Sequence, residues 1–171
     1  EKIKKIILNK LKEVGAIVLF GSVIQTNYKE FNDIDILIVV KKEFWRELNE
    51  KYDKIRELKQ ELKNKKINSH LQIIDKKTFY KAYPYNISLI YQLKDRKIIY
   101  GRLKLPLKIE IFKKAIEMKI DYSILENKKS EGIEIYKAIR NLFLIRLLMN
   151  KIIDNSKLNK RLVSELGENI I

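Results

Sequence analysis

The chain reads LFGS at residues 19–22 and, ten residues later, DIDILIVV at residues 33–40. Short apolar runs that end at turn residues are typical of buried strands. We therefore expect strands over 16–20 and 34–40, with a turn at Gly21. The second run carries no polar residue after Asp35, which predicts a central strand of its sheet.

The turn and the two aspartates have complementary chemistry. Gly21 lets the backbone turn sharply and approach a ligand closely, and Ser22 is expected to open a short helix whose N–H groups are available to an anion. Asp33 and Asp35 are two residues apart on an extended strand, so their side chains leave the same face, with Cα atoms about 7 Å apart. Two carboxylates at this spacing can hold divalent metal ions that also bind phosphate oxygens.

These residues resemble the signature of the polymerase-beta-type nucleotidyltransferase superfamily: Gly-Ser, then about ten residues, then Asp-x-Asp on a strand. The closest resemblance is to its small minimal nucleotidyltransferases, and it covers residues 1–103. It implies that Gly21 and Ser22 contact a nucleoside triphosphate, with ATP as the first candidate. It also implies that Asp33 and Asp35 are catalytic and bind Mg²⁺ or Mn²⁺.

The sequence departs from this superfamily at the position of a third carboxylate, which usually lies on a following strand. Here that strand is expected over 67–74, where strand alternation puts His70 and Gln72 on the face of the acidic pair. We expect His70, the only histidine, to act as a metal ligand or base, and Gln72 to contact the nucleotide. The same departure is also typical of a site that has lost its chemistry. Asp75 falls on the other face and is expected to cap the next helix.

The remaining pattern predicts an α/β (α+β) domain with a small mixed sheet and helices on its faces. The expected helices cover 2–14 (ended by Gly15), 43–64, 76–82 and 86–93, and a further strand covers 97–100. The long helix 43–64 has apolar residues at helical spacing, which we expect in the core. They are Trp45, Leu48, Tyr52, Ile55, Leu58 and Leu62.

The part after Leu105-Pro106 is expected to form a helical bundle, with helices over 107–120, 121–151 and 156–168. This divides the chain into a nucleotidyltransferase-like domain, 1–103, and a helical domain, 104–171. The segment YKAIRN at 136–141 faintly resembles HEPN helical domains. Their ribonuclease motif requires a histidine shortly after the arginine, whereas residues 144–146 are Leu, Ile and Arg, so we do not expect that activity.

Composition restricts the possible partners and compartments. The formal net charge of +15 favours nucleotide or nucleic acid as a partner, although a solvated lysine-rich surface gives the same charge. The chain has no cysteine, which excludes zinc–thiolate sites and disulfides. No apolar run is long enough to span a membrane or form a signal peptide, so we expect a cytoplasmic protein. A charged fraction of 35% is typical of thermophile surfaces.

The leading hypothesis from the resemblance is a metal-dependent nucleotidyltransferase that moves a nucleoside monophosphate from a nucleoside triphosphate to an acceptor hydroxyl. The acceptor stays open between a protein tyrosine, an RNA 3′ end and a small hydroxyl compound. One alternative is a weakened or inactive nucleotide-binding module with an antitoxin-like regulatory role. The other is a basic protein that binds nucleic acid. Dimerisation through the helical domain is compatible with each hypothesis.

Overall fold

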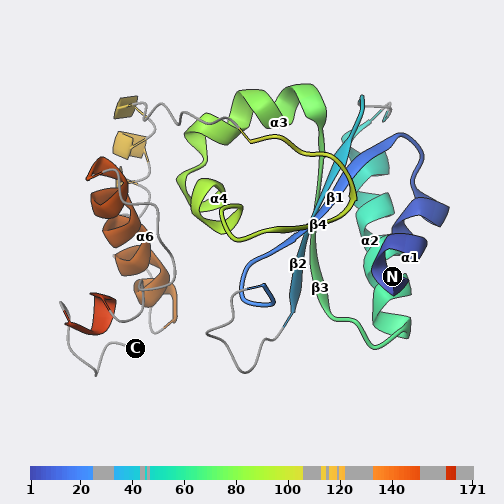
Figure 1. Cartoon of the computed structure of the whole chain (residues 1–171), viewed down its shortest axis with the longest axis horizontal. Helices are drawn as coiled ribbons and strands as arrows, with labels where there is room; N and C mark the ends of the chain where they lie inside the picture. Colours follow the sequence, from blue (N-terminus) through green and yellow to red (C-terminus); the bar gives the residue numbers. More distant parts are fainter. Residues whose placement is uncertain are drawn as a thin grey trace. The chain divides into compact units, whose positions relative to one another are not determined.

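The computed structural model describes residues 1–24, 33–42, 45, 47–105, 113–114, 116–118, 120–121, 133–150 and 161–164. The chain divides into two compact units, each described separately below (Figure 1). The first unit comprises Glu1–Ala82 and Asp95–Leu107, and the second comprises Tyr83–Lys94 and Lys108–Ile171. In the described residues no helix is long and apolar enough to cross a membrane.

A four-stranded mixed sheet forms the centre of the first unit. Its strands are β1 (Val14–Phe20), β2 (Ile34–Val40), β3 (Ser69–Asp75) and β4 (Lys97–Gly101), in the order β3-β2-β1-β4. β1 is antiparallel to both β2 and β4, and β2 is parallel to β3. The predicted mixed sheet with flanking helices is therefore confirmed, and β2 is an inner strand, as its apolar sequence predicted.

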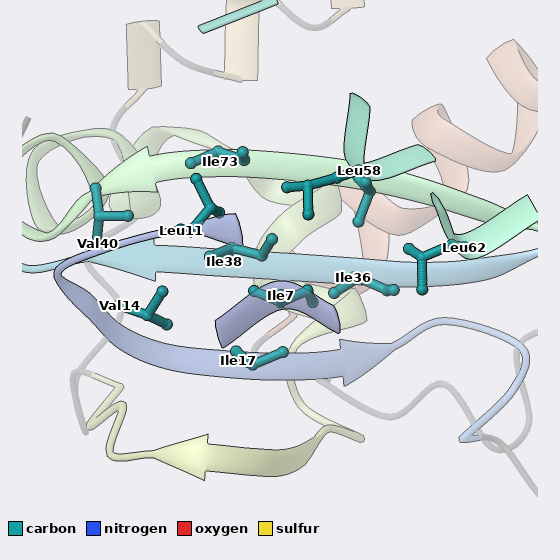
Figure 2. Packing of buried hydrophobic residues seen from close by; sticks show 11 residues of the cluster. Ile7, Leu11, Val14, Ile17, Ile36, Ile38, Val40, Leu58, Leu62 and Ile73 are labelled. Atoms are coloured by element: carbon teal, nitrogen blue, oxygen red, sulfur yellow. The ribbon is translucent and has the colours of Figure 1, made fainter. Parts of the chain in front are cut away.

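Two helices cover one face of this sheet, α1 (Lys2–Lys10) and α2 (Leu48–Asn64), as Figure 1 shows. Alternate residues of the strands point toward them and form the main core (Figure 2). Leu58 and Leu62 of α2 are fully buried against this layer. The other buried residues of this core are Ile7, Leu11, Val14, Ile17, Ile36, Ile38, Val40, Leu71 and Ile73.

The other residues of the same strands lie on the opposite face, beside α3 (Lys76–Ala82). Phe20 and Leu37 are each 1% exposed and Phe79 of α3 is fully buried, so this face is also largely apolar. Asp35 belongs to it, because it is two residues before Leu37 on β2. The face under α1 and α2 is thus apolar at its centre, with Ser69 and Asp75 at the two ends of β3. The opposite face has polar residues at one end.

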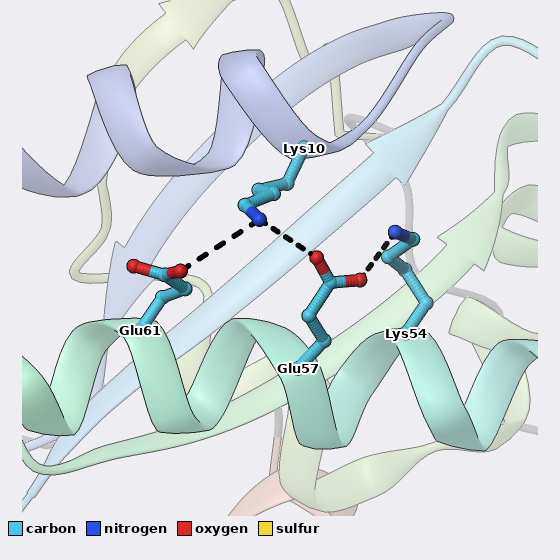
Figure 3. A network of polar contacts seen from close by, with 4 residues as sticks. All are labelled: Lys10, Lys54, Glu57 and Glu61. Atoms are coloured by element: carbon cyan, nitrogen blue, oxygen red, sulfur yellow. Dashed lines mark hydrogen bonds and ion pairs between the residues drawn. The ribbon is translucent and has the colours of Figure 1, made fainter.

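Charged side chains link α1 to α2 (Figure 3). Lys10 Nζ lies 2.9 Å from Glu57 Oε1 and 3.7 Å from Glu61 Oε1, and Lys54 binds the other Glu57 oxygen. The hydrogen bonds from Lys54 and Lys10 lower the pKa of Glu57 to about 2. The Glu57 side chain is 39% exposed, so screening by water keeps the stabilisation small.

Two details of the predicted helices are wrong. The first helix ends at Lys10 rather than near residue 14, because Glu13, with φ 56°, makes the turn, and Gly15 lies inside β1. Of the core residues predicted on α2, Leu48 and Tyr52 are 63% and 54% exposed. They occupy the first turns of the helix, and the buried residues Leu58 and Leu62 lie nearer its C-terminal end.

The second unit is helical in its described part. It contains the 3₁₀ turn η1 (Tyr83–Tyr85), α4 (Ile87–Gln92) and α6 (Ile133–Met149). Pro84 lies in η1, which agrees with the predicted break between two short helices. The buried Tyr91 hydroxyl donates to the Leu144 carbonyl oxygen at 3.2 Å, and burial raises the Tyr91 pKa to about 12. Much of 107–132 and 151–171, where further helices were predicted, lies outside the described residues.

The antiparallel pairing of Gly101 in β4 with Ala16 in β1 provides a test of the fold. Gly101 has φ +68°, and a Cβ there would lie 1.9 Å from the Gly15 carbonyl oxygen. Gly101→Ala should therefore lower the free energy of unfolding by about 2 kcal/mol or more, through left-handed strain and loss of strand pairing. Urea denaturation measures this loss. The control is Gly15→Ala, whose Cβ would meet the Val39 carbonyl oxygen at 3.2 Å and should cost clearly less; equal losses would contradict the geometry.

Candidate functional site

The turn after β1 lies directly against an aspartate of β2. The antiparallel register pairs Phe20 with Asp35, so the next residue, Gly21, adjoins the Asp35 side chain. Gly21 has φ +74°, and a Cβ added to it would lie 2.2 Å from Asp35 Oδ2. Only glycine fits here, both for its backbone conformation and for the space that the carboxylate occupies.

The Gly-Ser turn is tight where the structure describes it. The Ile24 N–H donates to the Gly21 carbonyl oxygen at 3.1 Å, and Ser22 is half-buried. Residues 22–24, where Ser22 was expected to open a short helix, form a turn, and residues 25–32 lie outside the described residues. The structure therefore places Gly21 beside Asp35, with Ser22 as the next residue of the turn.

His70 is the second neighbour of Asp35. The parallel register of β2 and β3 pairs these two residues, and His70 Nδ1 lies 3.1 Å from Asp35 Oδ1. The Asp35 side chain is 23% exposed and that of His70 is 52% exposed. Burial raises the Asp35 pKa, the hydrogen bond from His70 opposes this rise, and the nearby charge of Asp33 adds to it.

Asp33 and Gln72 lie at the borders of this group. Asp33 directly precedes β2, is half-buried, and is close enough to disfavour the charged form of Asp35. Gln72 pairs with Leu37, one step farther along the same face of the sheet. The structure thus brings Gly21, Asp35 and His70 together, with Asp33 beside them and Gln72 farther along β3.

A divalent cation fits the chemistry of the two aspartates. Their carboxylates are hard oxygen donors, and their mutual repulsion and partial burial would be relieved by a cation between them. Among the residues that the structure describes, no group of three or more His, Asp or Glu side chains is arranged to hold a metal ion. Mg²⁺ often takes only one or two protein carboxylates and completes its shell with water and substrate phosphates, so two carboxylates could hold it.

Asp75 lies at the other end of β3 and serves the local fold. Its Oδ1 accepts the Thr78 N–H at 2.9 Å, which caps the start of α3 as the sequence predicted. Burial pushes its pKa up, but the hydrogen bonds from Thr78 and Lys77 outweigh this and lower it. Asp75 therefore does not supply the third carboxylate.

Sequence reasoning missed two contacts of the site: the close approach of Gly21 to Asp35, and the hydrogen bond between Asp35 and His70. Both contacts depend on the register between strands that are joined by long connections. One of these connections, residues 23–32, has no apolar periodicity that would predict its structure. The one available signal was the pattern itself, since a glycine at the end of β1 and an acidic residue at the start of its antiparallel neighbour must meet once the strands pair.

Comparison with known proteins shows the family and the fold of the chain. The family model for the polymerase beta nucleotidyltransferase domain matches residues 1–103, whereas no curated protein sequence matches the chain. Spectinomycin adenyltransferase AAD(9) from Enterococcus faecialis, solved with ATP and spectinomycin, is 22% identical with a TM-score of 0.64, covering 99% of this chain and 84% of that one. A complex of the tri-AMPylated Shewanella oneidensis HEPN toxin with MNT antitoxin gives 16% identity and a TM-score of 0.39, covering 88% and 92%. The chain belongs to the polymerase beta nucleotidyltransferase family.

Proposed function

We propose that this protein transfers a nucleoside monophosphate from a nucleoside triphosphate to an acceptor hydroxyl. The observation that carries the proposal is the contact between Gly21 and Asp35, where a Cβ would be 2.2 Å from the carboxylate oxygen. A phosphate bound on the backbone of the turn would lie beside a carboxylate that can share a cation with it. We take ATP as the nucleotide to test, because AAD(9), which has a similar fold, was solved with ATP.

In this proposal Gly21 and Ser22 hold the triphosphate, and Asp33 and Asp35 hold Mg²⁺ or Mn²⁺. A bound metal would neutralise charge on the phosphates during the transfer. The acceptor oxygen forms a new bond to the α-phosphorus while the bond to the β-phosphate oxygen breaks, and pyrophosphate leaves. The hydroxyl proton goes to a base.

His70 is the candidate for that base. Its Nδ1 faces Asp35 Oδ1 at 3.1 Å, so the tautomer that donates from Nδ1 leaves Nε2 to accept a proton. The aspartate then orients the imidazole. Gln72, farther along the same face, is proposed as a nucleotide contact.

One observation supports the alternative of a nucleotide-binding module without turnover. The position beside Asp35 holds an imidazole rather than a third carboxylate, and the described residues contain no group of three ligands. Such a site would bind nucleotide with metal but transfer slowly or not at all. Release of pyrophosphate, measured with and without candidate acceptors, separates the two functions.

Removal of the acidic pair tests the metal. The double variant Asp33→Asn/Asp35→Asn should weaken Mg²⁺-dependent ATP binding by at least about tenfold, because the cation loses both charged ligands. The fold should persist. Burial raises the Asp35 pKa, so above the pKa of the unfolded state the ionised carboxylate destabilises the folded protein. Its replacement by a neutral amide should therefore keep or raise Tm. Calorimetry with and without Mg²⁺ measures binding. Asp53→Asn, which removes an exposed acid paired with Arg56 on α2, is the control; equal binding by all three proteins would contradict the proposal.

Gly21→Ala tests the turn. The added Cβ would collide with Asp35 Oδ2, and the alanine would have to adopt a left-handed φ. The carboxylate must therefore move away from the turn. We expect ATP affinity to fall by about tenfold or more in a protein that still unfolds cooperatively. A folded Gly21→Ala protein with unchanged ATP affinity would show that this turn does not hold phosphate.

His70→Asp tests the third position. A carboxylate in place of the imidazole would adjoin Asp35 and should raise Mn²⁺ affinity by about tenfold, while like-charge repulsion lowers Tm without metal. Gln72→Asp is the matched variant, because position 72 pairs with Leu37 and its gain should be smaller. Manganese titration followed by electron paramagnetic resonance measures both. If neither variant gains affinity, the third ligand does not lie on this face of β3.

A further inference from the structure

The side of α2 that faces away from α1 carries an exposed stripe of side chains. Glu57 and Glu61 bind Lys10 of α1 (Figure 3), and successive residues of an α-helix are about 100° apart around its axis. Lys59 is two residues from each glutamate and therefore lies on the other side of the helix. Three further side chains lie within about 40° of Lys59. The stripe consists of Leu48, Tyr52, Lys59 and Lys63, which are all exposed.

The stripe lies at the β3 edge of the sheet. β3 is an outer strand, and Figure 2 shows Leu58 of α2 beside β3, whereas Ile7 of α1 lies between β1 and β2. Because α1 covers the inner strands and α2 covers the edge, the side of α2 that faces away from α1 points outward. A second molecule can approach the stripe there without displacing either helix.

The two ends of the stripe differ in chemistry. Leu48 and Tyr52 are 63% and 54% exposed, more than any other large apolar side chain in the described part of the first unit. Lys59 and Lys63 form no ion pair with any described residue. Favourable interaction with the helix dipole accounts for lysines near the C-terminus. It does not account for a leucine and a tyrosine that lie side by side in water on adjacent turns.

A second copy of α2 in antiparallel orientation matches each end of the stripe with its opposite. With a two-fold axis near residue 55, Leu48 meets Lys63 of the second copy and Tyr52 meets Lys59. The long lysine stems can then cover the apolar side chains, and the ammonium of Lys59 can lie over the tyrosine ring. The stripe is therefore complementary to itself.

Asp53 and Arg56 have the same symmetry beside the stripe. They form an ion pair within α2, and their side chains are 63% and 77% exposed. In the antiparallel arrangement Asp53 faces Arg56 of the second copy, and Arg56 faces Asp53. The two pairs thus join into a ring of four alternating charges, which contributes more than isolated exposed ion pairs do.

We propose that the outward side of α2 joins two copies of this chain in an antiparallel, two-fold symmetric dimer. Such an interface requires a patch that is complementary to itself, which the stripe and the Asp53–Arg56 pair provide. A polyanion or an anionic membrane fits less well, because the exposed acids Glu47, Glu50 and Asp53 adjoin the apolar end. This inference is independent of the proposed function.

The size of the contact determines how strong the dimer is. The 17 residues of α2 span about 25 Å, so a contact along this one helix is at the low end of specific interface sizes. We therefore expect a dissociation constant on the order of 10–100 µM. Sedimentation velocity of the full chain from about 5 to 300 µM covers this range, and a wild-type protein that stays monomeric throughout would overturn the proposal.

Charge reversal tests the antiparallel register. Asp53→Arg makes all four central charges positive and Arg56→Asp makes all four negative, so each variant should self-associate about tenfold or more weakly through like-charge repulsion. An equimolar mixture of the two variants should form a heterodimer, because opposite charges meet again. Both sites are exposed, so Tm should change little. Self-association as in wild type, or no association in the mixture, would overturn the proposed arrangement.

An apolar substitution separates this surface from one on the helical unit. Tyr52→Ser should weaken self-association by about 3–10-fold, because the tyrosine loses its contact with the second copy. The matched control is Met149→Ser on α6, since Met149 is also 63% exposed, and it should leave the dimer unchanged. A larger loss for Met149→Ser than for Tyr52→Ser would overturn the proposal in favour of an interface on the helical unit.

Discussion

The register between β1 and β2 is the constraint on which the site depends. Pairing of Phe20 with Asp35 brings the backbone of Gly21 against the carboxylate, with no room for a side chain between them. A slip of one residue would turn Asp35 toward the core under α1 and α2 and expose Ile36 instead. The apolar cluster that includes Ile17, Ile36 and Ile38 makes such a slip very costly, so the hydrophobic core itself positions the turn against the acid.

The fold also tolerates unfavourable electrostatics at this end of the sheet. Asp35 is partly buried next to another acid, and both effects raise its pKa, which means that its ionised form costs stability at neutral pH. His70 relieves part of that cost through its hydrogen bond. His70 offsets only part of the repulsion between the two acids and of the cost of burying Asp35. A site with such excess negative charge is suited to bind a cation, because the cation supplies the missing positive charge.

Much of this arrangement follows from sequence, and what does not has a physical cause. Apolar runs predicted β1 and β2, and alternation on β3 put His70 on the Asp35 side, because a strand with one apolar face has only one acceptable register. The end of α1 was misplaced because Glu13, not glycine, takes the left-handed turn. Leu48 and Tyr52 were assigned to the core from helical spacing alone, but periodicity does not tell how far along a helix the core extends. The approach of Gly21 to Asp35 is a tertiary contact, which could be expected from the sequence only once the antiparallel pairing of β1 and β2 was known.

The charged residues of α2 differ in their partners along the helix. Near its middle, Glu57 joins Lys10 and Lys54 in a network that ties α2 to α1. At its C-terminal end Lys63, Lys65 and Lys66 form no ion pair among the described residues. Lys66 has a left-handed φ of 60°, which glycine would adopt at lower cost. Glu13, which also has a left-handed φ, forms an ion pair with Lys41, so such a conformation does not by itself mark a residue that binds a ligand.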